Sequence, residues 1–291
     1  MTKTINPKDI STGEFHALML GAIAPRPIAF ASTIDKEGNV NLSPFSFFNA
    51  FGSNPPLLIF SPARRVRDNT IKHTLENVLE IPEVVINIVN FSMVEQMSLA
   101  STEYEKGVNE FIKAGFTEIK SDKIRPPRVA ESPVAFECIV KQVIETGTQG
   151  GAGNLVICEV IMAHFNENIL DKNGKIDTPK MDLVARMGGD YYCRVIPEAL
   201  FEIPKPLVSK GIGFDNLPLH VRESHILSAN NLGRLANVEK LPTAEEIKNF
   251  KESINFDKNS NRNLEDLHKK AQHLLEQNDL KTAWLTLSLV S

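Results

Sequence analysis

The chain has 291 residues and a formal net charge of −4, with 42% apolar and 23% charged residues. A chain of this length forms one large domain or two modest ones, and it is long enough to bury a real hydrophobic core. The acidic balance excludes a bulk attraction to nucleic acid or to acidic membranes, so each basic cluster is interpreted as a local site.

Several absences bear on location and metal binding. Residues 1–7 contain no apolar run of the kind found in secretory signals, and no stretch reaches the roughly 20 apolar residues of a membrane helix. Cys138, Cys158 and Cys193 are far apart and form no CxxC motif, which predicts buried small apolar side chains. The seven histidines show no metal-ligand spacing, so we expect no metal site. These observations predict a cytoplasmic protein.

Residues up to about 200 have the pattern of strands and turns. We expect strands over residues 27–34, 40–48, 55–61, 83–89, 134–143 and 154–164, with the Gly-rich residues 147–153 as a hairpin turn. A helix is expected from Asp68 or Asn69 to Glu80, and shorter helices over residues 93–100 and 108–114. Regular strands with short turns favour a barrel over alternating βαβ units.

The composition changes near Pro204-Lys205-Pro206. We therefore predict a barrel domain over residues 1–205 and a helical C-terminal extension over residues 206–291. Thr243 opens a helix through a capping box with Glu246, and residues 263–277 and 279–289 have the pattern of two more helices. Three roles fit this extension: a small helical subdomain, a cover over the barrel, or a dimer arm.

Residues 61–72, S-P-A-R-R-V-R-D-N-T-I-K, carry the strongest chemical signal. Their cations and short hydroxyl and amide groups suit a phosphate, which makes charge-assisted hydrogen bonds of about 1.5–3 kcal/mol each. The helix expected after Asp68 would add backbone N–H groups at its start. The alternative is a solvated charged loop, in which Asp68 caps the helix or holds an arginine.

Residues 41–49, N-L-S-P-F-S-F-F-N, fit the wall of a ring-binding site. Ser43, Ser46 and Asn49 offer hydrogen bonds to heteroatoms, and the phenylalanines offer flat apolar surface. The alternative is a strand in which core phenylalanines alternate with polar residues. A second polar-aromatic segment, residues 186–192, contains two adjacent glycines that allow close backbone approach, and its alternative is a plain turn.

Taken in order, these segments resemble the flavin reductase-like family, the FMN-binding split barrels that include flavoredoxin. The resemblance covers residues 15–200. It rests on P-R-P-I-A at 25–29, S-T-I-D at 32–35, the run at 41–49, P-P-L at 55–57, R-D-N-T at 67–70, P-R-V-A-E-S-P-V at 127–134 and R-M-G-G-D-Y at 186–191.

The resemblance implies a mainly β fold with flanking helices, namely a six-stranded antiparallel Greek-key split β-barrel. It also implies bound FMN and a homodimer, with the flavin near the subunit interface, its ring against residues 43–46 and its phosphate by residues 61–70. Relatives carry a Lys-Asp-Thr run where this chain has residues 67–70, and arginine there keeps the positive charge. The helical extension lies outside the shared core.

The residues expected to contact the flavin share these segments: Arg26, Asn41, Ser43, Pro44, Phe45, Ser46, Ser61, Pro62, Ala63, Arg64, Arg67, Asn69, Thr70, Lys72, Ser101 and Arg186. Among them Arg64, Arg67 and Lys72 are expected to hold the phosphate. No G-x-S-x-G elbow or other catalytic group stands out, as expected where the cofactor carries the chemistry.

The function expected from the resemblance is an NAD(P)H-dependent flavin reductase that passes hydride from the nicotinamide of NADH or NADPH to FMN, with a further electron acceptor. Three alternatives stay open: a flavoredoxin-like electron-transfer protein reduced by a protein partner, a non-enzymatic flavin-binding module, and a split barrel that binds another ligand such as haem.

Overall fold

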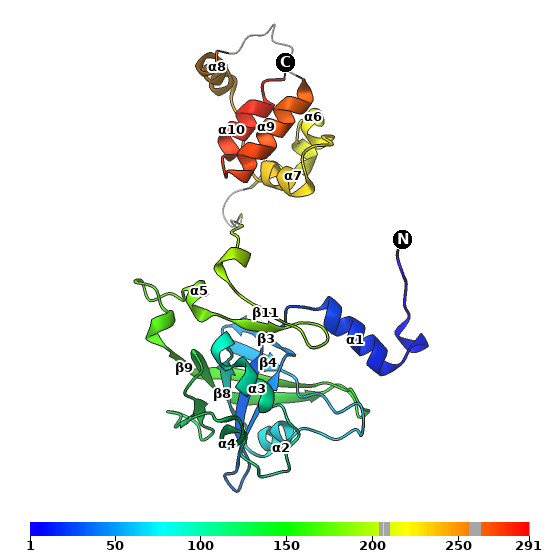
Figure 1. Cartoon of the computed structure of the whole chain (residues 1–291), viewed down its shortest axis with the longest axis vertical. Helices are drawn as coiled ribbons and strands as arrows, with labels where there is room; N and C mark the ends of the chain where they lie inside the picture. Colours follow the sequence, from blue (N-terminus) through cyan, green and yellow to red (C-terminus); the bar gives the residue numbers. More distant parts are fainter. Residues whose placement is uncertain (204–205, 207–209, 256–262, 291) are drawn as a thin grey trace. The chain divides into compact units, whose positions relative to one another are not determined.

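The computed structural model describes residues 1–203, 206, 210–255 and 263–290. The chain forms two compact units, Met1–Leu200 and Phe201–Ser291 (Figure 1). The boundary predicted from composition, at Lys205, lies outside the described residues. Within the described ranges, no helix combines the length and the apolar character needed to cross a membrane.

The first unit is built on a seven-stranded antiparallel sheet with strand order β2-β1-β5-β8-β9-β4-β3. Its strands are β1 (Ala29–Ile34), β2 (Val40–Phe45), β3 (Phe48–Ser53), β4 (Pro56–Phe60), β5 (Glu83–Ile88), β8 (Val134–Glu145) and β9 (Asn154–Phe165). Two short ribbons accompany it, β6 (Glu118–Ile119) with β7 (Arg128–Val129) and β10 (Val184–Arg186) with β11 (Tyr192–Arg194).

The sheet curls into a split barrel. Its two edge strands, β2 and β3, are separated along the chain only by Ser46 and Phe47. Each residue spans at most about 3.6 Å, so the two edges must come close together. In the described part of the chain β2 and β3 are not paired, which leaves the barrel open at this seam.

The mainly β prediction is therefore confirmed, and the strand count is corrected from six to seven. The extra strand arises because the run predicted over residues 40–48 breaks at Ser46-Phe47, after which β3 pairs with β4. Every β3 residue after Phe48 is exposed, so this strand has none of the apolar alternation that a sequence pattern detects.

Two apolar clusters lie on opposite faces of β1. Ala29 and Ala31 face one cluster, which includes Phe60, whereas Phe30 faces the other, which includes Phe111. This division follows from the two-residue period of a strand. Helix α2 (His73–Glu80) contributes to the first cluster, and α3 (Val94–Leu99) and α4 (Glu110–Ala114) contribute to the second.

Helix α1 (Thr12–Ala22) differs from these helices because none of its residues is buried. It begins with a capping box in which Ser11 accepts a hydrogen bond from the backbone of Glu14 while the Glu14 carboxylate accepts from the backbone of Ser11. The sequence analysis did not predict α1. A last short helix, α5 (Thr178–Met181), precedes β10.

The second unit is helical, as the extension was expected to be. It contains α6 (Leu219–Arg222), α7 (Ala229–Ala236), α8 (Ala244–Ser253), α9 (Leu264–Glu276) and α10 (Leu280–Leu287). The capping box of Thr243 and Glu246 is present. Trp284 is buried in a core of this unit's own, and its indole N–H donates to the carbonyl of Leu235 at 3.2 Å.

Candidate functional site

A small hollow opens to solvent in the first unit, where β2, residues 61–72, the start of α2 and the segment after α3 meet. We call residues 61–72 the cationic loop. The residues that line the hollow are mostly polar: Asn41, Ser43, Arg65, Lys72, His73, Thr74, Ala100, Ser101, Thr102, Glu103, Tyr104 and Glu110. Four of the predicted flavin contacts are among them: Asn41, Ser43, Lys72 and Ser101.

Strand β2 supplies two side chains to the hollow, Asn41 and Ser43, which lie two residues apart and therefore on one face. Asn41 is fixed in orientation because its amide group donates to Glu110 Oε1 at 2.9 Å and its amide oxygen accepts from Thr74 Oγ1 at 2.6 Å. This network holds β2 against α2 and α4, and it fixes where Ser43 presents its hydroxyl.

Glu110 is a buried carboxylate that the sequence analysis missed. Its second oxygen accepts from the backbone N–H of Leu42 at 2.9 Å. Burial raises the pKa of Glu110, and the hydrogen bonds from Leu42 and Asn41 offset only part of that increase. No sequence signal marks the residue, since a lone glutamate before an apolar segment is typical of any helix start.

The cationic side of the hollow consists of Arg65 and Lys72. Arg65 donates through Nη1 to Thr70 Oγ1 and to the carbonyl of Ile71, both at 2.8 Å, and through Nε to Glu103 Oε1 at 2.8 Å. Lys72 is half-buried, and its pKa is lowered by burial first and by the charge of Arg65 second. Among the described residues its ammonium group has no hydrogen-bond or ion-pair partner. A partly desolvated cation of this kind favours an anionic ligand.

The helix that follows the cationic loop begins later than predicted. Helix α2 starts at His73, not after Asp68, and no side chain caps it. Asp68 instead accepts from the backbone N–H of Thr70 at 3.1 Å and from its hydroxyl at 2.6 Å, which lowers the pKa of Asp68. The run at the helix start is therefore Lys72-His73-Thr74.

The Gly-rich hairpin turn between β8 and β9 is confirmed, and it also supports the cationic loop. The backbone of Arg64 donates to Ala152 at 2.9 Å and accepts from Gly151 at 3.0 Å, while the Asn69 side chain donates to the carbonyl of Thr148 at 3.0 Å. A Cβ at Gly150 would lie 3.0 Å from two carbonyl oxygens of the loop, so glycine permits this close approach.

The predicted arginines mostly bond within the protein. The Arg64 Nε donates to Asn69 Oδ1 at 2.9 Å, and the exposed Arg67 donates to Asp68 and Glu103. Arg26 is buried, and its guanidinium donates to the carbonyls of Leu20, Ile23 and Met187. It thereby ties the end of α1 to the segment after β10, away from the hollow.

Further predicted contacts lie in the core or the loops rather than in the hollow. Phe45 is buried against Phe60, with ring centroids 5.3 Å apart, so it does not offer a wall to a ligand. Ser61 and Pro62 are buried and accept hydrogen bonds from the backbone and side chain of Asn154, respectively. The remaining members also lie outside the lining: Pro44 and Ser46 near the seam, Ala63 in the cationic loop, and Arg186 at the end of β10, above the Tyr192 ring.

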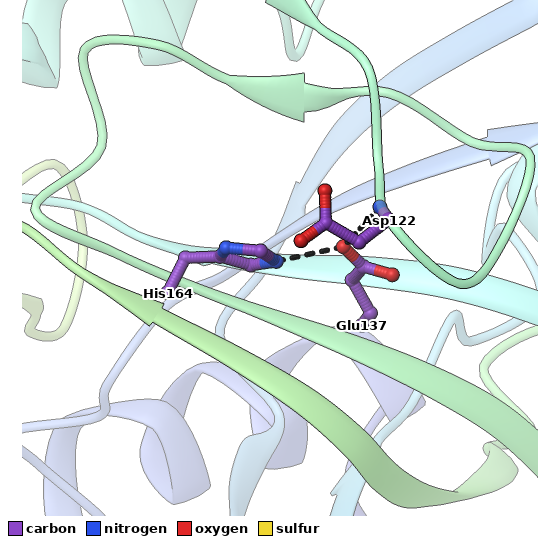
Figure 2. Close-up of side chains that lie close together, drawn as sticks. All are labelled: Asp122, Glu137 and His164. Atoms are coloured by element: carbon purple, nitrogen blue, oxygen red, sulfur yellow. Dashed lines mark hydrogen bonds and ion pairs between the residues drawn. The ribbon is translucent and has the colours of Figure 1, made fainter.

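A separate cluster joins Asp122, Glu137 and His164 (Figure 2), whose possible ligand atoms lie within 4.8 Å of one another. Both oxygens of the fully buried Glu137 already accept hydrogen bonds, one from the backbone of Asp122 and His164 Nε2, the other from the backbone of Lys123. These bonds account for the buried carboxylate without an ion. The cluster anchors the loop before β7 to β8 and β9.

Known proteins match the first of the two units. The family model described as "Flavin reductase like domain" matches residues 20–180. The chain belongs to this family. An uncharacterized protein of Aquifex aeolicus is 35% identical over 196 residues, which are 67% of this chain and 97% of that protein.

Several solved structures resemble this chain over about the length of the first unit. Nitrilotriacetate monooxygenase component B from Bacillus cereus aligns with a TM-score of 0.65 and 30% identity, over 70% of this chain and 99% of that one. A putative flavin reductase with a split barrel domain from Shewanella frigidimarina aligns with a TM-score of 0.58 and 27% identity, over 68% of this chain and 95% of that one. The chain is therefore a flavin reductase-like protein with a split-barrel fold, and the family-model match ends before the second unit begins.

Proposed function

We propose that the protein is an FMN-binding oxidoreductase that accepts hydride from NADH or NADPH. The observation that carries the proposal is the half-buried Lys72, whose ammonium group has no hydrogen-bond or ion-pair partner among the described residues. It lies at the start of α2, where no side chain caps the helix, in a polar hollow of a flavin reductase-like fold. A helix start offers unpaired backbone N–H groups and a positive dipole end, both of which favour a phosphate.

The residues of the hollow fit the two ends of a flavin mononucleotide. Lys72, Arg65 and the first N–H groups of α2 suit the phosphate, while Ser43 and the oriented amide of Asn41 suit the polar edge of the ring. Tyr104 adds an aromatic ring to the lining. This assignment replaces Arg64 and Arg67, which the sequence analysis favoured, with Arg65 beside Lys72.

Bound FMN would supply a two-electron acceptor for the hydride of a reduced nicotinamide. The protein's own task is to bind and orient. Lys72 holds the anionic end, the Glu110–Asn41–Thr74 network keeps β2 in place, and Ser43 donates a hydrogen bond to the ring edge that gains negative charge on reduction. No proton donor among these side chains is required for that role.

Anaerobic reduction tests the proposal. The purified protein, loaded with FMN, is expected to lose its yellow absorbance rapidly on addition of NADH or NADPH. Retention of the oxidised spectrum with both nucleotides, but reduction by a protein donor, would establish the flavoredoxin-like alternative. Failure to bind FMN at all would leave a binding module for another ligand, and a haem spectrum would identify that ligand.

We further propose that the first unit forms a homodimer through α1 and the β3 edge. Helix α1 buries none of its residues although it carries Leu18 and Met19, and Phe51 on β3 has 63% of its surface exposed. The His16 and Phe47 rings lie 6.0 Å apart, so α1, with its exposed Leu18 and Met19, lies beside the seam. An unpaired edge strand beside exposed apolar side chains favours association with a second copy.

Replacing Phe51 with Glu is expected to shift the protein from dimer to monomer, because a carboxylate would be desolvated in the interface. Light scattering after size-exclusion chromatography measures the change. Ile112→Glu, at a position on α4 that is 78% exposed, is the matched control and should leave the mass unchanged. A monomeric wild-type protein would contradict the proposal.

A further inference from the structure

Glu103 bridges two arginines of the cationic loop, Arg65, which lines the hollow, and the exposed Arg67. Its Oε1 accepts from Arg65 Nε at 2.8 Å, and its Oε2 accepts from Arg67 Nη2 at 3.0 Å. Glu103 comes from a different part of the chain, the segment that follows α3, and it lines the hollow together with Arg65 and Lys72. An acidic side chain thus projects into a region otherwise suited to an anion.

The bridge has the same hydrogen-bonding pattern that a phosphate would form. Two anionic oxygens on one centre each accept a charge-assisted bond from a separate guanidinium, which is the recognition that phosphate and carboxylate share. The hydrogen bonds from Arg67 and Arg65 keep the pKa of Glu103 below its usual value, so the side chain carries its charge at neutral pH. A phosphate dianion and this carboxylate cannot share Arg65 without strong repulsion.

The bridge is also placed so that it can open. The Glu103 side chain is 43% exposed and that of Arg67 is 73% exposed, so both can turn into solvent without unfolding the loop. Arg65 is only 17% exposed and keeps its bonds to Thr70 and Ile71 when Glu103 leaves. The loop's shape therefore does not depend on the carboxylate, and exposed ion pairs of this kind are weak enough to exchange.

We propose that Glu103 is an internal competitor for the flavin phosphate, pairing with Arg65 while no flavin is bound and thereby making the flavin exchangeable. The inference rests on the proposed function, since it assumes that the phosphate binds beside Lys72. Flavin entry exchanges one anion for another on Arg65. Affinity for FMN is consequently lower than the cations of the hollow alone would give.

The test is the variant Glu103→Gln, titrated with FMN and with riboflavin, which has the same ring system but no phosphate. Removing the charge should tighten FMN binding about 3- to 30-fold, the range expected when two exposed ion pairs no longer compete, and slow FMN release. Riboflavin affinity should stay within about twofold. The matched control is Glu105→Gln, which removes the same charge from an exposed residue outside the lining of the hollow and should change neither affinity.

The outcomes separate the inference from the proposed function. If wild-type protein binds FMN and Glu103→Gln binds it equally or more weakly, Glu103 does not compete with the phosphate, and a weaker value shows that it orients the arginines instead. If riboflavin binding tightens in parallel, Glu103 opposes the ring rather than the phosphate, and the inference is again overturned. If wild-type protein and both variants bind no FMN while their thermal unfolding is unchanged, the proposed function itself fails.

Discussion

Replacing Lys72 with Met should weaken FMN binding about 10- to 100-fold. A charge-assisted hydrogen bond is worth about 1.5–3 kcal/mol, and each 1.4 kcal/mol corresponds to a factor of ten in affinity. The methionine keeps most of the apolar stem that lies half-buried beside Arg65, so the fold should persist. The loss should fall on the phosphate, and riboflavin affinity should change by less than about twofold.

Flavin fluorescence titration measures both affinities. Lys172→Met, in an exposed turn after β9, is the matched control and should leave both values unchanged. A different result would contradict this assignment. If Lys72→Met left FMN affinity unchanged while an Arg64→Ala and Arg67→Ala double variant lost it, the phosphate would bind the arginines that the sequence analysis favoured. Equal losses for FMN and riboflavin would show that Lys72 contacts the ring instead.

Replacing Glu137 with Gln should lower the free energy of unfolding of the first unit by about 2–4 kcal/mol at neutral pH. The amide removes the charge from hydrogen bonds with the backbone of Asp122 and Lys123, and it turns an N–H₂ group toward buried donors. Urea unfolding followed by circular dichroism measures the change. Glu145→Gln, exposed on the same strand, is the control and should lie within about 0.5 kcal/mol of wild type.

The difference in the free energy of unfolding between wild type and Glu137→Gln should depend on pH. Burial raises the pKa of Glu137, but the hydrogen bonds from Asp122, Lys123 and His164 outweigh it, so the pKa in the folded state is below its usual value. Because the pKa of Glu137 is lower in the folded than in the unfolded state, the ionised carboxylate stabilises the fold fully above the unfolded-state pKa of about 4.3. This stabilisation is lost as the pH falls through the folded-state pKa. Wild type and Glu137→Gln should therefore converge in acid, and a gap that widens there would contradict the assigned hydrogen bonds.

The sequence was sufficient to predict the elements that have a strong hydrophobic pattern or end at a proline or glycine. Strands β5, β8 and β9 are apolar runs bounded by Pro82, the glycines of residues 147–153 and similar breakers, and their predicted positions agree with the structure to within a few residues. The capping box at Thr243 is a local hydrogen-bond pattern that needs no tertiary partner, so it too was visible.

The sequence did not predict the elements that depend on contacts with residues far away along the chain. Strand β3 is exposed along almost its whole length and exists because it pairs with β4. Helix α1 buries nothing within the first unit, so its apolar residues give no one-sided pattern. The start of α2 was misplaced because Asp68, an excellent cap by type, turns back to Thr70 instead.

The side chains of the candidate site could be predicted only in part from the sequence. The cationic loop and the polar face of β2 were found from residue types, but not which arginine faces the hollow. Arg64, Arg65 and Arg67 are indistinguishable in a list of charges, and only the turn closed by Asp68 and the Gly-rich hairpin separates them. Glu103 and Glu110 gave no signal because their partners are 36 to 69 residues away along the chain.

The location of the single tryptophan, Trp284, makes it a natural fluorescence probe. Trp284 is enclosed in the helical unit, whereas the proposed flavin site belongs to the barrel unit. Oxidised flavin absorbs light in the range where indole emits, so the pair forms an intrinsic donor and acceptor for resonance energy transfer. Quenching of the donor on flavin addition would report, without any attached dye, how near the helical bundle comes to the yellow chromophore.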